Sequence, residues 1–79
     1  MSGRTVRFYF RKLDATLRPN RGYEHALQEV SYRALDNTTP RQSWINAAGY
    51  FVVQTEESYR NRLKRAMWDA GCVLDHTGF

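Results

Sequence analysis

The stretch Thr5-Val6-Arg7-Phe8-Tyr9-Phe10-Arg11 alternates between apolar side chains and side chains that are charged or carry a hydroxyl group. This period of two residues is typical of a β-strand that packs one face on a core. The face predicted to pack on the core carries Val6, Phe8 and Phe10, and the opposite face carries Arg7, Tyr9 and Arg11. Guanidinium groups bind phosphates and phenol rings stack on bases, so the second face is a candidate binding surface. An ordinary solvated sheet surface is the alternative.

Two short strands are predicted at residues 43–46 and 50–54, joined by a hairpin with Gly49 at the position that needs a positive φ. If Phe51 and Val53 point into the core, Tyr50 lies on the outer face and can join the arginines and tyrosine of the first strand. The opposite register would place Tyr50 and Val52 in the core. The position of Tyr50 therefore decides whether the outer face is a stacking platform or a charged sheet surface.

Two helices follow from apolar residues with helical spacing. The first is predicted over residues 23–35, after a loop at residues 14–22, and its apolar stripe consists of Tyr23, Ala26, Leu27, Val30 and Ala34. The second is predicted to begin with Thr55 as its N-cap and with Glu56 and Glu57 in its first turn, and to end at Gly71. Its stripe consists of Tyr59, Leu63, Ala66, Met67 and Ala70.

The resulting order β-α-β-β-α, with a further strand if residues 72–74 form one, predicts an α+β fold in which a small antiparallel sheet carries both helices on one face. With the last strand this is the ferredoxin-like (split βαβ) arrangement. Without it, the order and length resemble the DinI-like βαββα fold of SOS-response modulators. The acidic C-terminal helix of that family is replaced here by a basic one, so its activity is not implied. We expect one domain over residues 1–79, with loose ends at about 1–4 and 75–79.

The second helix carries a further candidate surface on the side away from its apolar stripe. Its members are Arg60, Asn61, Lys64, Arg65 and Trp68. An indole on a basic helix face is a plausible contact for a protein or a nucleic acid, whereas the alternative is that the chain after residue 72 folds back over it. Part of the charge is expected in i,i+4 pairs, Glu56 with Arg60 and Arg65 with Asp69. On the first helix, His25, Glu29 and Tyr32 share the predicted solvent face.

Composition narrows the classes of partner and of chemistry. The formal net charge is +4, and the basic residues are concentrated in residues 1–21 and 60–79, which favours an anionic partner. No apolar run is long enough to cross a bilayer, so no membrane partner is expected. The lone Cys72 cannot form an internal disulfide, which suits the cytoplasm. Because Cys72, His25 and His76 lack the spacing of paired ligands, no metal and no cofactor are predicted.

These features favour a small cytoplasmic binding module without catalytic activity, a regulator or inhibitor that contacts RNA or single-stranded DNA. The alternative is a protein-interaction module of phage or mobile-element origin that binds an acidic surface of a host protein. A third hypothesis is a small ribonuclease with a ferredoxin-like fold, because Asp14 follows the first strand as an acidic residue does in such enzymes. A homodimer is a further expectation, since a chain of this size gains buried area by pairing.

Overall fold

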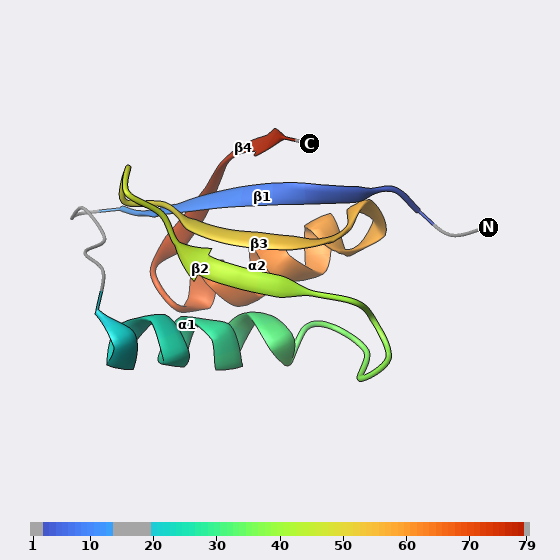
Figure 1. Cartoon of the computed structure of the whole chain (residues 1–79), viewed down its shortest axis with the longest axis horizontal. Helices are drawn as coiled ribbons and strands as arrows, with labels where there is room; N and C mark the ends of the chain where they lie inside the picture. Colours follow the sequence, from blue (N-terminus) through green and yellow to red (C-terminus); the bar gives the residue numbers. More distant parts are fainter. Residues whose placement is uncertain (1–2, 14–19, 79) are drawn as a thin grey trace.

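The computed structural model describes residues 3–13 and 20–78, and within them the strands form one four-stranded antiparallel sheet (Figure 1). Its members are β1 (Thr5–Lys12), β2 (Gln42–Ile45), β3 (Phe51–Glu56) and β4 (Cys72–Gly78). The strand order is β2-β3-β1-β4, so β1 and β3 are central and β2 and β4 are the edges. The predicted α+β class with a small antiparallel sheet is therefore confirmed.

The alternating strand packs as its sequence pattern predicts. Val6, Phe8 and Phe10 are buried in the hydrophobic core, together with side chains from both helices. Helix α1 (Arg21–Tyr32) contributes Leu27, and helix α2 (Arg60–Asp69) contributes Leu63 and Met67. Both helices thus cover the same face of the sheet, and we refer to the opposite face, which neither helix covers, as the outer face.

The predicted hairpin between β2 and β3 is also present. Gly49 has a φ of 88°, and the Asn46 side chain accepts hydrogen bonds from the backbone N–H groups of Ala48 and Tyr50. Phe51 and Val53 belong to the core, which places Tyr50 on the outer-face side of the alternation. The register left open by the sequence is therefore the one that brings Tyr50 toward β1.

The first helix begins two residues earlier than predicted. Asn20 is its N-cap, and the Asn20 side chain accepts a hydrogen bond of 3.0 Å from the backbone N–H of Tyr23. The helix ends at Tyr32 rather than at residue 35. Ala26, predicted to lie in the apolar stripe, is exposed, whereas Ser31 is fully buried because its hydroxyl donates to the backbone carbonyl of Gln28. Residues 14–19 of the predicted loop lie outside the described residues.

The prediction that Thr55 caps the second helix is wrong. Thr55 is a buried residue of β3, and its hydroxyl donates a hydrogen bond of 2.9 Å to the backbone carbonyl of Pro40. Pairing with Val6 extends β3 through Glu56, and a 3₁₀ turn at Glu57–Tyr59 then precedes α2. The predicted end of the helix is confirmed, since Gly71 has a φ of 83°.

The last strand is longer than the predicted residues 72–74. Asp75, expected in a loose tail, instead lies inside β4, which continues to Gly78. The pairing with β1 contains a bulge, because Phe10 lies opposite Leu74 whereas Tyr9 lies opposite His76. Asp75 is the extra residue of this bulge.

Helix α1 protects one edge of the sheet. At β2, the Glu24 carboxylate accepts a hydrogen bond from the backbone N–H of Ile45, and the Gln28 amide donates one to the backbone carbonyl of Ser43. The Tyr32 hydroxyl lies 2.6 Å from the Ser43 hydroxyl. Tyr32 therefore does not lie on a solvated face as predicted but joins α1 to β2. The outward backbone groups of β2 are thus already bonded within the chain.

Candidate functional site

A cluster of aromatic rings lies on the outer face of the sheet. The ring of Tyr9 stacks on that of His76, with centroids 4.3 Å apart and an interplanar angle of 11°. The ring of Tyr50 meets both edge-on, at 6.0 Å from Tyr9 and 5.3 Å from His76. Edge-to-face and offset-stacked arrangements are those that aromatic pairs prefer. We call Tyr9, Tyr50 and His76 the ring cluster.

The carboxylate of Asp75 ties the ring cluster to Arg11. One carboxylate oxygen lies 2.7 Å from His76 Nδ1, and the other accepts a hydrogen bond of 3.2 Å from Arg11 Nε. Hydrogen bonding to His76, together with hydrogen bonds from Arg11 and Tyr50, lowers the pKa of Asp75 below its ordinary value of 3.8. About half of the Arg11 side chain remains exposed, so this guanidinium is positioned by Asp75 and still accessible.

Arg7 is held on the same face by different neighbours. Its Nε donates a hydrogen bond of 2.9 Å to the side-chain oxygen of Gln54, and its guanidinium lies 5.5 Å from the centroid of the Trp44 ring. Val52 pairs with Trp44 on one side and with Tyr9 on the other. Although it lies on the outer face, Val52 has no exposed surface, whereas Trp44 and Tyr9 are only half-buried. Side chains alone therefore cover the centre of this face.

The structure brings together four of the predicted site residues, Arg7, Tyr9, Arg11 and Tyr50, and adds Trp44, Asp75 and His76. Trp44 was recognisable from its position between Ser43 and Ile45, since alternation along β2 places it opposite the buried Ile45. His76 was not, because regular alternation after the buried Cys72 would turn position 76 toward the core. The bulge at Asp75 reverses that direction.

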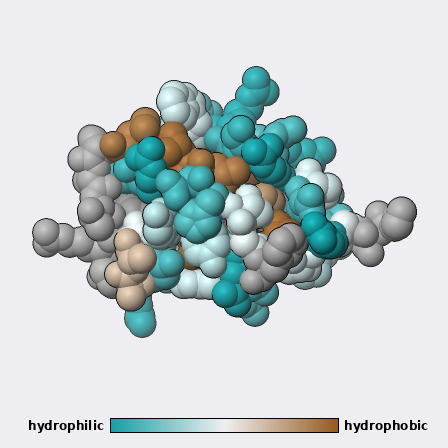
Figure 2. Space-filling model, turned by 90° about the horizontal axis from the view of Figure 1, so that it is seen from above, coloured by the Kyte–Doolittle hydropathy of each residue, from teal (hydrophilic) through white to brown (hydrophobic). Residues whose placement is uncertain are grey.

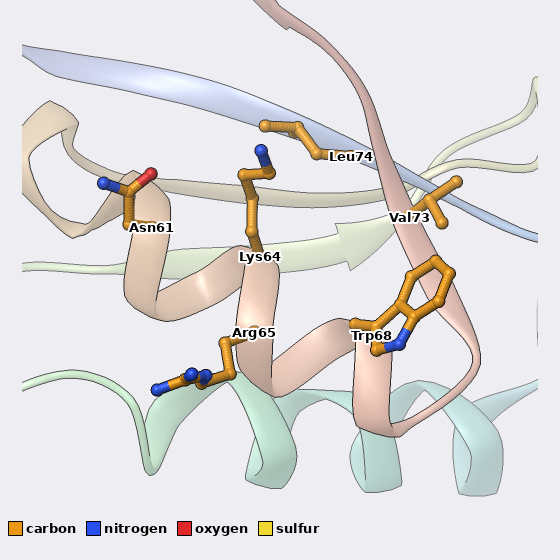
Figure 3. Close-up of a pocket in the computed structure, with 6 residues that line it drawn as sticks. All are labelled: Asn61, Lys64, Arg65, Trp68, Val73 and Leu74. Carbon is orange, nitrogen blue, oxygen red and sulfur yellow. The ribbon is translucent and has the colours of Figure 1, made fainter.

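The basic residues of α2 lie elsewhere on the molecule. Because α2 packs against the core face, its surface does not join the outer face into one track. Lys64, Arg65 and Trp68 line a groove between α2 and β4, whereas Arg60 is exposed but does not line it (Figure 3). Trp68 is 60% exposed, so Val73 and Leu74 border the indole without covering it. Figure 2, viewed from above Figure 1, shows hydrophobic surface among largely hydrophilic side chains.

The ion pairs predicted along α2 do not form within residues 3–13 and 20–78. Glu56 instead accepts hydrogen bonds from the backbone N–H of Gly3 and from the hydroxyl of Ser58, so it is unavailable to Arg60. Neither Arg65 nor Asp69 takes part in an ion pair in this part of the chain. The charge of α2 is therefore less neutralised than the sequence pattern predicts.

Other candidate groups supply little chemistry. Cys72 is buried, and desolvation raises the pKa of its thiol above the ordinary value of 9.0. His25 lies 3.4 Å from Glu29 on the exposed side of α1. Asp14 lies outside the described residues. Among the residues that are described, no group of three or more histidine, cysteine, aspartate or glutamate side chains could hold a metal ion. No helix there is both long and apolar enough to span a membrane.

Comparison of the chain with protein-family models, with curated proteins and with solved structures found no significant match. The class that fold and surface define is therefore a small α+β protein with a four-stranded sheet and an aromatic and basic outer face.

Proposed function

We propose that this chain is a small binding module whose outer sheet face contacts single-stranded nucleic acid. The observation that carries this proposal is the ring cluster of Tyr9, Tyr50 and His76, which lies between Arg7 and Arg11 on the face that neither helix covers. Rings on a sheet surface offer flat apolar area to unpaired bases, and the arginines offer charge to the phosphates.

The topology supports the same proposal. We infer a ferredoxin-like (split βαβ) arrangement, which the order β2-β3-β1-β4 with antiparallel neighbours supports. The ring cluster then lies above the two central strands, where a bound strand can cross the sheet. Bases of a duplex are stacked on each other and unavailable to such rings, so single strands are the expected ligand.

The two arginines are suited to phosphate contact by the way they are held. Arg7 and Arg11 each use Nε for an internal hydrogen bond, to Gln54 and to Asp75 respectively. Their terminal nitrogens make no printed hydrogen bond within residues 3–13 and 20–78 and can point toward a ligand. A positioned guanidinium loses less conformational entropy on binding than a mobile one.

The test is fluorescence anisotropy with labelled oligo(dT) and oligo(U) at several salt concentrations. Affinity should fall steeply between roughly 50 and 200 mM salt, and the double variant Arg7→Gln/Arg11→Gln should reduce the slope of that dependence by about two. Arg33→Gln/Arg60→Gln removes the same charge from exposed positions away from this face and serves as the matched control. Absence of binding at 50 mM salt, or an equal effect of both double variants, would refute the proposal.

The ring cluster is tested separately by His76→Ala. The His76 side chain is about half exposed, so its removal should leave the core intact. If a base stacks on this ring, affinity should weaken by roughly 1–3 kcal/mol with little change in the salt slope. A change in slope without loss of affinity at low salt would argue against stacking.

A further inference from the structure

We propose that the groove between α2 and β4 binds an extended acidic segment of a partner protein, which adds to the sheet as a strand beside β4. This site is separate from the outer face and does not depend on nucleic-acid binding there. Three observations carry the inference: the lining of the groove, its unpaired cations, and the contrast between the two edges of the sheet.

The groove has apolar walls of a size that fits side chains. It has a volume of about 470 Å³ and is lined by Trp68, Val73 and Leu74 together with Asn61, Lys64 and Arg65. Figure 3 shows the Trp68 indole beside Val73 and the Lys64 side chain extending toward Leu74. An exposed indole next to two aliphatic side chains is the kind of pocket that anchors a protein interface.

The charge of the groove specifies an acidic occupant. Lys64 and Arg65 make no ion pair and no hydrogen bond with any side chain in the described ranges. Glu56, the acidic residue nearest in sequence to the start of α2, bonds Gly3 and Ser58 instead. A carboxylate that reaches the groove would therefore meet two cations without displacing an internal partner.

The two edges of the sheet differ in a way that favours strand addition at β4. Side chains of α1 bond the outward N–H of Ile45 and the outward C=O of Ser43 at the β2 edge. No side chain in residues 3–13 or 20–78 makes the equivalent bond to β4, whose edge lies beside the groove. An edge strand with free backbone groups pairs with an extended peptide, and pockets for alternate side chains then provide specificity.

These features favour a protein segment over the other occupants. Valine and leucine side chains have no complement on a phosphate backbone, so a nucleic acid would leave Val73 and Leu74 unused. A second copy of the chain related by a two-fold axis would bring Lys64 and Arg65 toward their own counterparts, and like charges at close range oppose that pairing.

The experiment is selection of octapeptides from a random displayed library against the full chain, followed by binding measurements on the synthetic peptides selected. Peptides should be enriched in aspartate and glutamate alternating with apolar residues. Trp68→Ala and Lys64→Glu should each weaken binding by about tenfold or more. Arg60→Glu, which makes the same charge change on the same helix outside the groove, should leave binding nearly unchanged. Circular dichroism verifies that each variant is folded.

Strand addition has its own readout. Binding should slow amide hydrogen exchange in β4 but not in β2, and N-methylation of alternate peptide backbone nitrogens should abolish binding in one of the two registers. Failure to enrich any peptide, absence of acidic residues from those enriched, or equal effects of Lys64→Glu and Arg60→Glu would overturn the proposal. So would displacement of the peptide by oligo(dT), or a dimer in ultracentrifugation that Trp68→Ala dissociates.

Discussion

The rings of Tyr9 and His76 lie nearly parallel with centroids 4.3 Å apart, although one residue belongs to the first strand and the other to the last. Their contact depends on the bulge in β4, which makes Asp75 the extra residue and places His76 opposite Tyr9. The same bulge brings the Asp75 carboxylate within reach of Arg11. One irregularity in pairing thus assembles both the ring cluster and the charged group beside it.

Truncation of Val52 should be as damaging as truncation of a core residue, although no helix covers it. Val52 has no exposed surface because the side chains of the outer face enclose it. Val52→Ala should lower the free energy of unfolding by about 1–3 kcal/mol in urea denaturation. Val73→Ala removes the same atoms from a half-buried position in β4 and should have a smaller effect. Equal effects of the two variants would mean that the outer face is loosely packed.

Replacement of Asp75 by asparagine should move stability and nucleic-acid affinity in opposite directions. Asp75→Asn weakens the contacts with Arg11 and His76, so the protein should become slightly less stable at neutral pH. Because a carboxylate leaves the proposed phosphate-binding face, affinity for oligo(dT) should rise. A fall in affinity would indicate that Asp75 positions Arg11 more than it repels the ligand.

The same variant predicts a pH dependence. Folding lowers the pKa of Asp75, so its contribution to stability is present above the ordinary value of 3.8 and is lost as pH falls through the lower folded value. The difference in unfolding free energy between the wild-type chain and Asp75→Asn should therefore be constant near neutral pH and shrink below about pH 4. Denaturant titrations of both proteins from pH 3 to 7 measure it. A difference that grows on acidification would contradict the assignment.

Gly71 should tolerate asparagine better than alanine. Its φ is 83°, and a Cβ added there would meet no atom within 4 Å, so the effect of substitution comes from the backbone alone. Gly71→Ala should destabilise the protein by about 1–2 kcal/mol, and Gly71→Asn by less, since asparagine enters the left-handed region more readily. Gly22→Ala lies within α1, where φ is not positive, and serves as the control with no loss expected.

The Cys72 thiol should be slow to react in the folded protein. Burial raises the pKa of Cys72 above 9.0, so the thiol stays protonated and shielded at pH 8. Labelling with a disulfide reagent should be rapid only in denaturant. Because the unfolded chain ionises first, stability should also fall as pH rises above about 9, and Cys72→Ala should lack that component. Rapid labelling of the native protein would contradict the buried position.

Much of the fold was predictable because it depends on local patterns. Alternation identified β1 and its core face, Gly49 marked the hairpin, and Gly71 marked the end of α2. The start of α2 was not predictable, because Thr55 has the chemistry of an N-cap and is used instead to bond Pro40 across a loop. Only the folded chain determines which of two partners for a hydroxyl group is within reach.

The sequence by itself determined that Arg7, Tyr9 and Arg11 share one side of a strand, since this follows from the period of two alone. The tertiary structure decided what that side means. It selected the register that brings Tyr50 to Tyr9, placed His76 there through a bulge, and separated this surface from Lys64 and Trp68 on α2. These relationships depend on pairing between distant segments, and the free energy of such pairing belongs to the whole sheet rather than to any short stretch of residues.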